Sequence, residues 1–209
     1  MKSSSVGVAH ICAVFVFTVL AQTSPAAIVT FDDLPANGFS PPNGYGGVKW
    51  PQAWGIMDAV TYGAGNGPNG YTAGMVSANN VNYVGEFAHA LMTSVSSGTK
   101  FDFDSAYLTA AWNDGLLVRA IGSFGGATLY DNTYTLNATG PMFINFGYTG
   151  VDSVEMYVTA AGTHHAGYAG SGTQWLMDDA TIVPEPGAAL LVGFSASLLM
   201  FRRRRTGGV

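Results

Sequence analysis

The chain has 209 residues, of which 48% are hydrophobic and only 10% are charged, and its formal net charge at pH 7 is −5. Residues 28–182 contain three basic and twelve acidic side chains, which gives this part of the chain a formal net charge of −9. Since nucleic-acid binding depends on Lys and Arg side chains that neutralise phosphates, this composition excludes nucleic acid as a partner.

Residues 1–27 have the pattern of a signal peptide. Lys2 precedes an apolar run at 11–20, and small residues follow it. A basic start, a short apolar helix and a small-x-Ala cleavage site are the three parts of such a peptide, and cleavage after Ala21 or after Ala26 fits equally well. We therefore predict export by the Sec translocon and removal of the leader by signal peptidase. The only cysteine, Cys12, is lost with the leader, so the mature protein has no disulfide.

Residues 28–182 are predicted to form one exported all-β domain. Apolar and polar residues alternate over short segments, and Phe101 and Phe103, for example, fall on the face opposite to Asp102 and Asp104. The predicted strands are 28–31, 100–104, 107–112, 116–121, 128–136, 142–147, 154–159 and 175–183, separated by turns at 113–115, 125–126, 139–141 and 149–150. Apart from one helical turn within 82–92, the pattern indicates an antiparallel β-sandwich, jelly-roll-like in arrangement.

The segment from residue 37 to residue 80 is rich in glycine, proline and asparagine. It is predicted to form long loops with short strands at best, gathered at one rim of the sandwich, where binding surfaces tend to lie. Trp50 and Trp54 belong to this segment and are candidates for stacking on sugar rings. Packing of the two indoles under a long loop explains them equally well.

Residues 183–209 form a tail of three parts. Two prolines, which disfavour helix in the residues before them, bracket a glutamate and mark the start of an uncharged run at 187–201. Fifteen helical residues reach roughly 22 Å, which is short for a permanent membrane anchor of about 20 residues. Arginines at the end stay in the cytoplasm, so everything before the motif is predicted to lie outside it. The motif is Pro184, Glu185 and Pro186, and the cytoplasmic anchor is Arg202, Arg203, Arg204 and Arg205.

The order of motif, apolar transmembrane helix and arginine run, over residues 183–205, resembles the PEP-CTERM sorting signal of Gram-negative bacteria. The resemblance implies that an exosortase processes the protein. It also implies that the protein is anchored transiently in the inner membrane and then released or attached at the cell surface. Species with this system tend to make exopolysaccharide, and a role in biofilm is the corresponding expectation. An ordinary stop-transfer anchor is the alternative interpretation of the tail.

Three short motifs in the exported domain resemble the Gly-rich β-domains that precede such tails. They are Phe31 to Leu34, Ser105 to Trp112 and Trp175 to Ile182. The last one is also similar to the final strand of jelly-roll carbohydrate-binding modules, where an Asp at this place often binds a structural calcium ion. The resemblance implies that role for Asp178 or Asp179.

Four acidic residues at the two ends of the domain form a candidate metal site. In jelly rolls the first and last strands often lie close together, so Asp32, Asp33, Asp178 and Asp179 are expected to converge. Calcium prefers several carboxylate and carbonyl oxygens and would offset the repulsion between these groups. The alternative is that each pair caps a strand or faces solvent.

Other candidates for chemistry are few. Asp102 and Asp104 lie two residues apart on one strand, about 6.6 to 6.8 Å at Cα, a spacing compatible with the acid and base of a glycosidase. The same alternation also describes an ordinary half-buried strand. His89, His164 and His165 have no further metal ligands at suitable spacing and are interpreted as structural or solvent-exposed.

The sequence therefore predicts a non-catalytic surface or extracellular-matrix protein, processed by an exosortase and binding exopolysaccharide. The alternative is a secreted polysaccharide hydrolase that uses the carboxylates of Asp102 and Asp104. A structural spacer without any ligand is the third interpretation.

Overall fold

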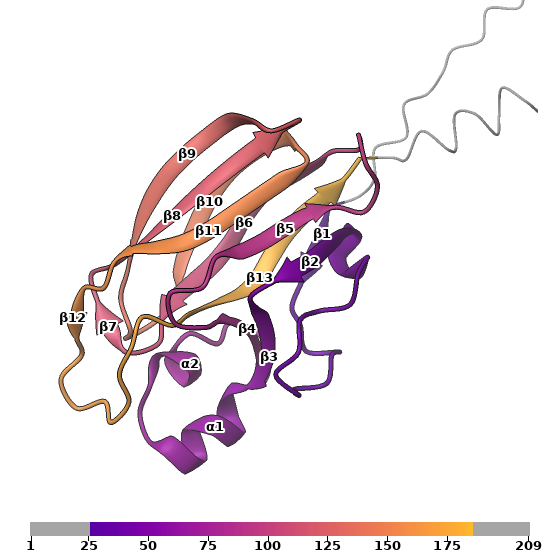
Figure 1. Ribbon diagram of the computed structural model, residues 1–209. Coiled ribbons are helices and arrows are strands. Elements are labelled where there is room, and N and C mark those ends of the chain that lie inside the picture. Colours follow the sequence, from indigo (N-terminus) through magenta and orange to yellow (C-terminus); the bar gives the residue numbers. More distant parts are fainter. Residues whose placement is uncertain (1–25, 186–209) are drawn as a thin grey trace, which may run out of the picture.

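The computed structural model describes residues 26–185, which form an antiparallel β-sandwich with two short helices at one end (Figure 1). Sheet A has the strand order β10-β6-β13-β4-β3, with β1 paired to β13, and sheet B has the order β2-β5-β11-β8-β9. A two-stranded sheet, β12-β7, lies at the end where the helices are.

The strands span Ala27–Val29 (β1), Val48–Gln52 (β2), Trp54–Asp58 (β3), Asn80–Val84 (β4), Ala90–Ser94 (β5), Phe101–Ala110 (β6), Asn113–Asp114 (β7), Leu116–Phe124 (β8), Ala127–Leu136 (β9), Met142–Val151 (β10), Ser153–Ala160 (β11), Thr163–His164 (β12) and Trp175–Pro184 (β13). The helices are α1 (Ala59–Asn66) and α2 (Gly70–Ala73), with a 3-10 turn at Tyr45–Gly47. Strand content, antiparallel pairing and the two-sheet arrangement confirm the predicted β-sandwich.

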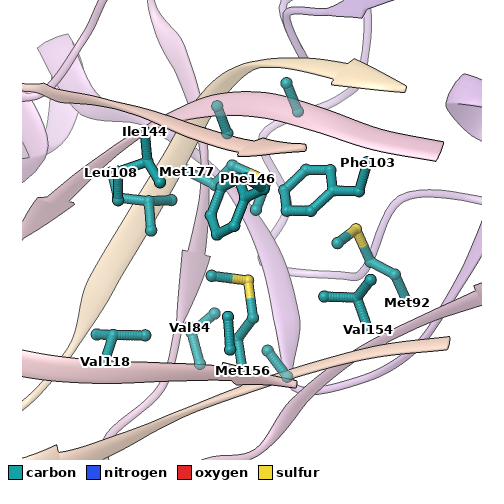
Figure 2. Close-up of a cluster of buried hydrophobic side chains, with 14 of the residues drawn as sticks. Val84, Met92, Phe103, Leu108, Val118, Ile144, Phe146, Val154, Met156 and Met177 are labelled. Carbon is teal, nitrogen blue, oxygen red and sulfur yellow. The ribbon is translucent and has the colours of Figure 1, made fainter. Parts of the chain in front are cut away.

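The main core fills the space between the two sheets. Phe103 stacks on Phe146 with ring centroids 4.3 Å apart, and methionines from both sheets fill the gaps around them (Figure 2). The buried residues of this cluster all lie between Val29 and Ile182, and all strands of both sheets lie within residues 27–184. Residues 26–185 therefore contain a complete core and form a unit that can fold by itself.

Three details of the predicted strands and turns were wrong. The turn predicted at 113–115 contains β7, which pairs with β12. The segments 100–104 and 107–112 form one strand, β6, and the turn predicted at 149–150 lies inside β10. There the pairing with β6 shifts register, and Gly147 and Gly150 have φ of 59° and 67°. Glycine accepts this left-handed backbone at low cost, so the residues that indicated a turn instead make bulges. The helical turn expected within 82–92 is absent, because β4 and β5 occupy both ends of that range.

The segment 37–80 is more ordered than predicted. It contains β2, β3 and both helices. The side chain of Asp58 accepts the Thr61 N–H at 2.9 Å and caps α1, and this hydrogen bond lowers the pKa of the Asp58 carboxyl. Asn69 caps α2 in the same way through the Thr72 N–H. The glycines of α1 argued against a helix, whereas the two N-caps were the signal that could have found both helices.

Most of the predicted leader and of the predicted tail lie outside the described residues, although Ala27, the last residue of the predicted leader, belongs to β1. The residues outside are 1–25 and 186–209, which include Pro186, the apolar run 187–201 and the four arginines. Between residues 26 and 185, the two helices are too short to cross a bilayer.

Candidate functional site

A partly exposed aromatic pair lies on the outer face of sheet A. Tyr107 and Phe143 are directly opposite each other in the β6–β10 register, and their ring centroids are 5.2 Å apart. Leu108 and Ile144 point into the core. Since successive side chains of a strand point to opposite faces, Tyr107 and Phe143, which precede them, point outward. Phe143 is 56% exposed, so the pair presents apolar ring surface to solvent.

Polar side chains without charge lie next to this aromatic pair. Ser105 and Asn145 form the neighbouring cross-strand pair two residues along the same face. The Asn145 side chain is exposed. Ring faces bordered by amide and hydroxyl groups can stack on the apolar faces of sugars while donating to and accepting from their hydroxyls. This combination was missed in the sequence, where Phe143 looked like any residue of an alternating strand.

Trp50 and Trp54 do not form the predicted stacking surface. They are 2% and 4% exposed, and their rings pack edge-to-face at 5.2 Å. Trp54 also packs against Trp175, and each of the two indole N–H groups donates to a backbone carbonyl. Rings enclosed in this way offer no face to a sugar. The expected glycan role is therefore corrected to core packing, the alternative explanation for this pair.

The buried carboxylate of Asp178 holds a loop onto the outer face of sheet A. It is fully buried, and its oxygens accept the backbone N–H groups of Val76 (2.8 Å), Ser77 (3.2 Å) and Asp179 (2.9 Å) and the Ser77 hydroxyl (3.1 Å). Burial raises the pKa of Asp178 to about 6, although the backbone hydrogen bonds act in the opposite direction. Asp178 therefore connects β13 to residues about a hundred positions earlier.

Of the other three predicted metal ligands, Asp179 follows Asp178 on β13 and donates its N–H to it, whereas Asp32 and Asp33 have separate surroundings. The first and last strands are adjacent as expected, since Val29 of β1 pairs with Ala180 of β13. However, Asp32 accepts the Asn80 N–H at 3.0 Å, and Asp33 accepts the Tyr45 hydroxyl at 2.5 Å. Among residues 26–185, no three His, Cys, Asp or Glu side chains are grouped for a metal ion. The hydrogen bonds seen at Asp32, Asp33 and Asp178 are those of carboxylates that fix loops.

The remaining acidic and histidine candidates are spread over the surface. Asp102 accepts the Gly150 N–H at 2.7 Å and so supports the bulge in β10. His165 contacts Asp114 at 2.6 Å, a hydrogen bond that lowers the pKa of the Asp114 carboxyl. His89 contacts Glu155 at 2.8 Å. Glu155 lies on β11 of sheet B, whereas Asp102 lies on β6 of sheet A.

The two ends of the described chain lie together. β1 and β13 are antiparallel, and Ala27 pairs with Ile182. In Figure 1 β1 and the end of β13 lie at the end of the sandwich opposite to α1 and α2. β13 runs two residues beyond the predicted domain boundary and ends at Pro184, the first residue of the predicted sorting motif.

The start of the motif is packed against the domain. A Cβ atom added to Gly47 would collide with the Pro184 ring, so the two residues are in close contact. The Glu185 N–H donates to the Lys100 carbonyl at 3.2 Å, whereas the Glu185 residue is exposed. The motif therefore begins directly at the surface of the sheet, without an intervening linker.

Comparisons with known proteins gave structural likenesses only. No family model and no curated protein matches the chain. The carbohydrate-binding module TmCBM61, solved in complex with β-1,4-galactotriose, is 11% identical with a TM-score of 0.41, over 75% of this chain and 95% of that one. The enzymatically active domain of tailspike protein 4 of bacteriophage CBA120 is 9% identical with a TM-score of 0.33, over 71% of this chain and 21% of that one. TM-scores this low decide neither function nor ligand, and the family resemblance of the tail stays a prediction.

Proposed function

We propose that the chain is an exported, non-catalytic surface or matrix protein that is processed at both ends, by signal peptidase and by an exosortase. The observation that carries the proposal is the pairing of Ala27 with Ile182 in β1 and β13. It brings the predicted leader site and the sorting motif to one end of a folded domain. A domain with both membrane segments attached at the same end can fold outside the membrane before either segment is cut.

The contact of Pro184 with Gly47 supports a close position of the domain above the membrane. Since β13 ends at Pro184, only the motif separates the sheet from the apolar run that starts at residue 187. The chain crosses repeatedly between the two sheets, although β3 and β4 are neighbours in sheet A and β8 and β9 are neighbours in sheet B, and these crossings support the jelly-roll-like arrangement as the scaffold. Cutting after the motif would leave this scaffold complete.

Changing Glu185 to alanine tests the processing step. Glu185 is exposed, whereas Pro184 is paired and packed, so this variant alters the motif without disturbing the sheet. We expect wild-type protein at the cell surface to end near residues 183 to 187, and the variant to remain intact to Val209 in the inner membrane. Mass spectrometry of the C-terminus measures both outcomes. Glu86→Ala, at another exposed acidic residue, is the control and should be processed normally. Intact wild-type chains at the outer surface would contradict the proposal.

We also propose that the domain binds a neutral exopolysaccharide at Tyr107 and Phe143. The pair is supported by its exposed ring surface and by the uncharged Ser105 and Asn145 beside it. The acidic balance of residues 28–182 disfavours a polyanionic glycan, because like charges would repel it. This surface replaces the one that the sequence placed at Trp50 and Trp54.

Phe143→Ala tests the glycan surface. Loss of one stacking ring is expected to weaken binding of a neutral polysaccharide about tenfold, which corresponds to roughly 1.4 kcal/mol. Isothermal titration calorimetry of residues 26–185 with the neutral exopolysaccharide purified from the organism that makes this protein measures the change. Phe87→Ala is the control, because Phe87 is 71% exposed and lies in the turn between β4 and β5. Equal losses in both variants would remove the assignment of this face.

A further inference from the structure

The edges of the two sheets are protected to very different degrees. Unpaired N–H and C=O groups of an edge strand are a template for another strand, and proteins usually block them with proline, lysine, bulges or a covering segment. Within the described part of the chain, the path of sheet A ends at β10 and β3, and that of sheet B ends at β2 and β9. Each edge can be examined for such a block.

The edges at β3, β2 and β10 each carry such a block. Ile56 of β3 is covered by the segment before it, since Gly38 donates to the Ile56 carbonyl at 3.0 Å and Ile56 donates to the Phe39 carbonyl at 3.0 Å. β2 has only 5 residues, contains Lys49 and Pro51, and shifts register against β5. β10 has the two glycine bulges described above.

β9 carries none of these devices over most of its length. It has 10 residues, none of them Pro or Lys, and it pairs regularly with β8 from Tyr130 to Leu136 (Figure 1). The only irregularity of this pairing lies before Tyr130. Thr and Tyr, which favour extended structure, make up most of the regular part.

The single charge on β9 is neutralised. Arg119 of β8 donates to both oxygens of Asp131, at 2.7 Å and 2.5 Å, and these hydrogen bonds lower the pKa of the Asp131 carboxyl. Arg119 also donates to the Tyr157 hydroxyl at 3.0 Å. A paired charge repels an approaching strand much less than a free one, so the edge lacks electrostatic protection as well.

We propose that β9 pairs antiparallel with β9 of a second copy of this chain and extends sheet B across a two-fold axis. Tyr130 and Tyr134 pack toward the core on Tyr148 and Phe146, so matching faces requires even-numbered residues to oppose even-numbered ones. Among registers centred beyond Tyr130, the two with the longest overlap that keep Asp131 away from its own copy are centred on Asn132 and on Thr133. Centred on Asn132, Asp131 opposes Thr133, and centred on Thr133, it opposes Thr135.

Self-pairing at this edge gives a closed dimer. A two-fold pairing of identical strands uses up both copies of β9, and the other edges named above are blocked. The edge is also self-complementary, because Tyr130 opposes Tyr134 in the register centred on Asn132, Thr133 opposes itself in the register centred on Thr133, and Asp131 meets no like charge in either. A second copy therefore fits it without any change in sequence.

Thr133→Asp separates this proposal from other modes of association. Thr133 is exposed and pairs with Arg119, so an aspartate there is tolerated within one copy. In the dimer it faces a like charge in either register, Asp131 in one and itself in the other. We expect sedimentation equilibrium of residues 26–185 to show a dimer for the wild type and about tenfold weaker association for the variant. Asn145→Asp on β10, the same change of charge at another edge, should dimerise like the wild type.

Thr133→Lys distinguishes the two registers. It should strengthen association in the register centred on Asn132, where it meets Asp131, and weaken it in the register centred on Thr133, where it meets itself. Amide hydrogen exchange at residues 130–136 should slow as the concentration rises. A wild-type domain that stays monomeric up to about 1 mM would overturn the proposal. So would a dimer that Thr133→Asp leaves unchanged.

Discussion

Replacing Phe103 with alanine is expected to lower the free energy of unfolding by about 3 to 5 kcal/mol. The ring is fully buried between the sheets and stacks on Phe146, and β6, which carries it, lies between β10 and β13 (Figure 2). The cavity would lie between strands paired on both sides, which restricts collapse around it. Urea unfolding of residues 26–185, followed by circular dichroism, measures the loss.

Phe39→Ala is the matched control for this measurement. Phe39 is 72% exposed, so its truncation should change the free energy of unfolding by less than about 0.5 kcal/mol. A loss below about 1 kcal/mol for Phe103→Ala would mean that the inner face of β6 is assigned wrongly. The wild-type spectrum should also be that of a β protein with little helix.

The alternation of residues was sufficient to predict the sandwich. In β6, Phe101 and Phe103 are buried and Asp102 and Asp104 are partly exposed, as the two-residue period predicts. The same pattern located β8, β9, β11 and β13 to within a few residues. Glycines were ambiguous, because Gly150 serves a bulge rather than a turn, and only the pairing of β10 with β6 decides between the two.

The candidate sites depended on long-range packing that sequence does not show. Trp50 lies in a segment that looked like a loop, yet its ring packs on Phe31 and Trp54 in the core. Conversely, Phe143 lies in a regular strand, yet its ring is exposed. Which face of a strand is covered depends on segments far away in sequence, and α1, α2 and the loop 75–77 cover only part of sheet A.

Asp178 illustrates the same limit. The expected adjacency of the first and last strands, from which its convergence with Asp32 was predicted, is confirmed by the β1–β13 pairing, but the two carboxylates have different partners. Its partners did not follow, because the donors are backbone N–H groups of Val76 and Ser77, which any residue type can supply. Carboxylates that accept backbone N–H groups and carboxylates that bind calcium look alike in sequence.

The stability of the domain should decrease as the pH rises from about 4 to about 6 because of Asp178. Its carboxyl has an ordinary pKa of 3.8, which burial raises to about 6 in the folded protein. The folded state therefore holds this proton more tightly than the unfolded state does. The extra stability is complete below the unfolded pKa and is lost as the pH rises through the folded one, by about 3 kcal/mol in total.

Asp178→Asn should remove that pH dependence, and Asp178→Ala should have a larger effect. Alanine leaves the N–H groups of Val76, Ser77 and Asp179 without their acceptor, at a cost of about 3 kcal/mol at neutral pH. Asparagine keeps one acceptor oxygen and cannot ionise, so its loss should be smaller and independent of pH over this range. Faster hydrogen exchange at the amides of residues 76 and 77 in both variants would locate the change in the loop.

Asp104→Asn is the control for the pH series, because Asp104 is a partly exposed carboxyl on β6. Urea midpoints of the three proteins between pH 4 and pH 7 should show parallel curves for the wild type and Asp104→Asn, and a flatter one for Asp178→Asn. If all three curves run parallel, the proton of Asp178 is not linked to folding, and its carboxylate stays ionised in the folded protein because the four donors around it outweigh its burial.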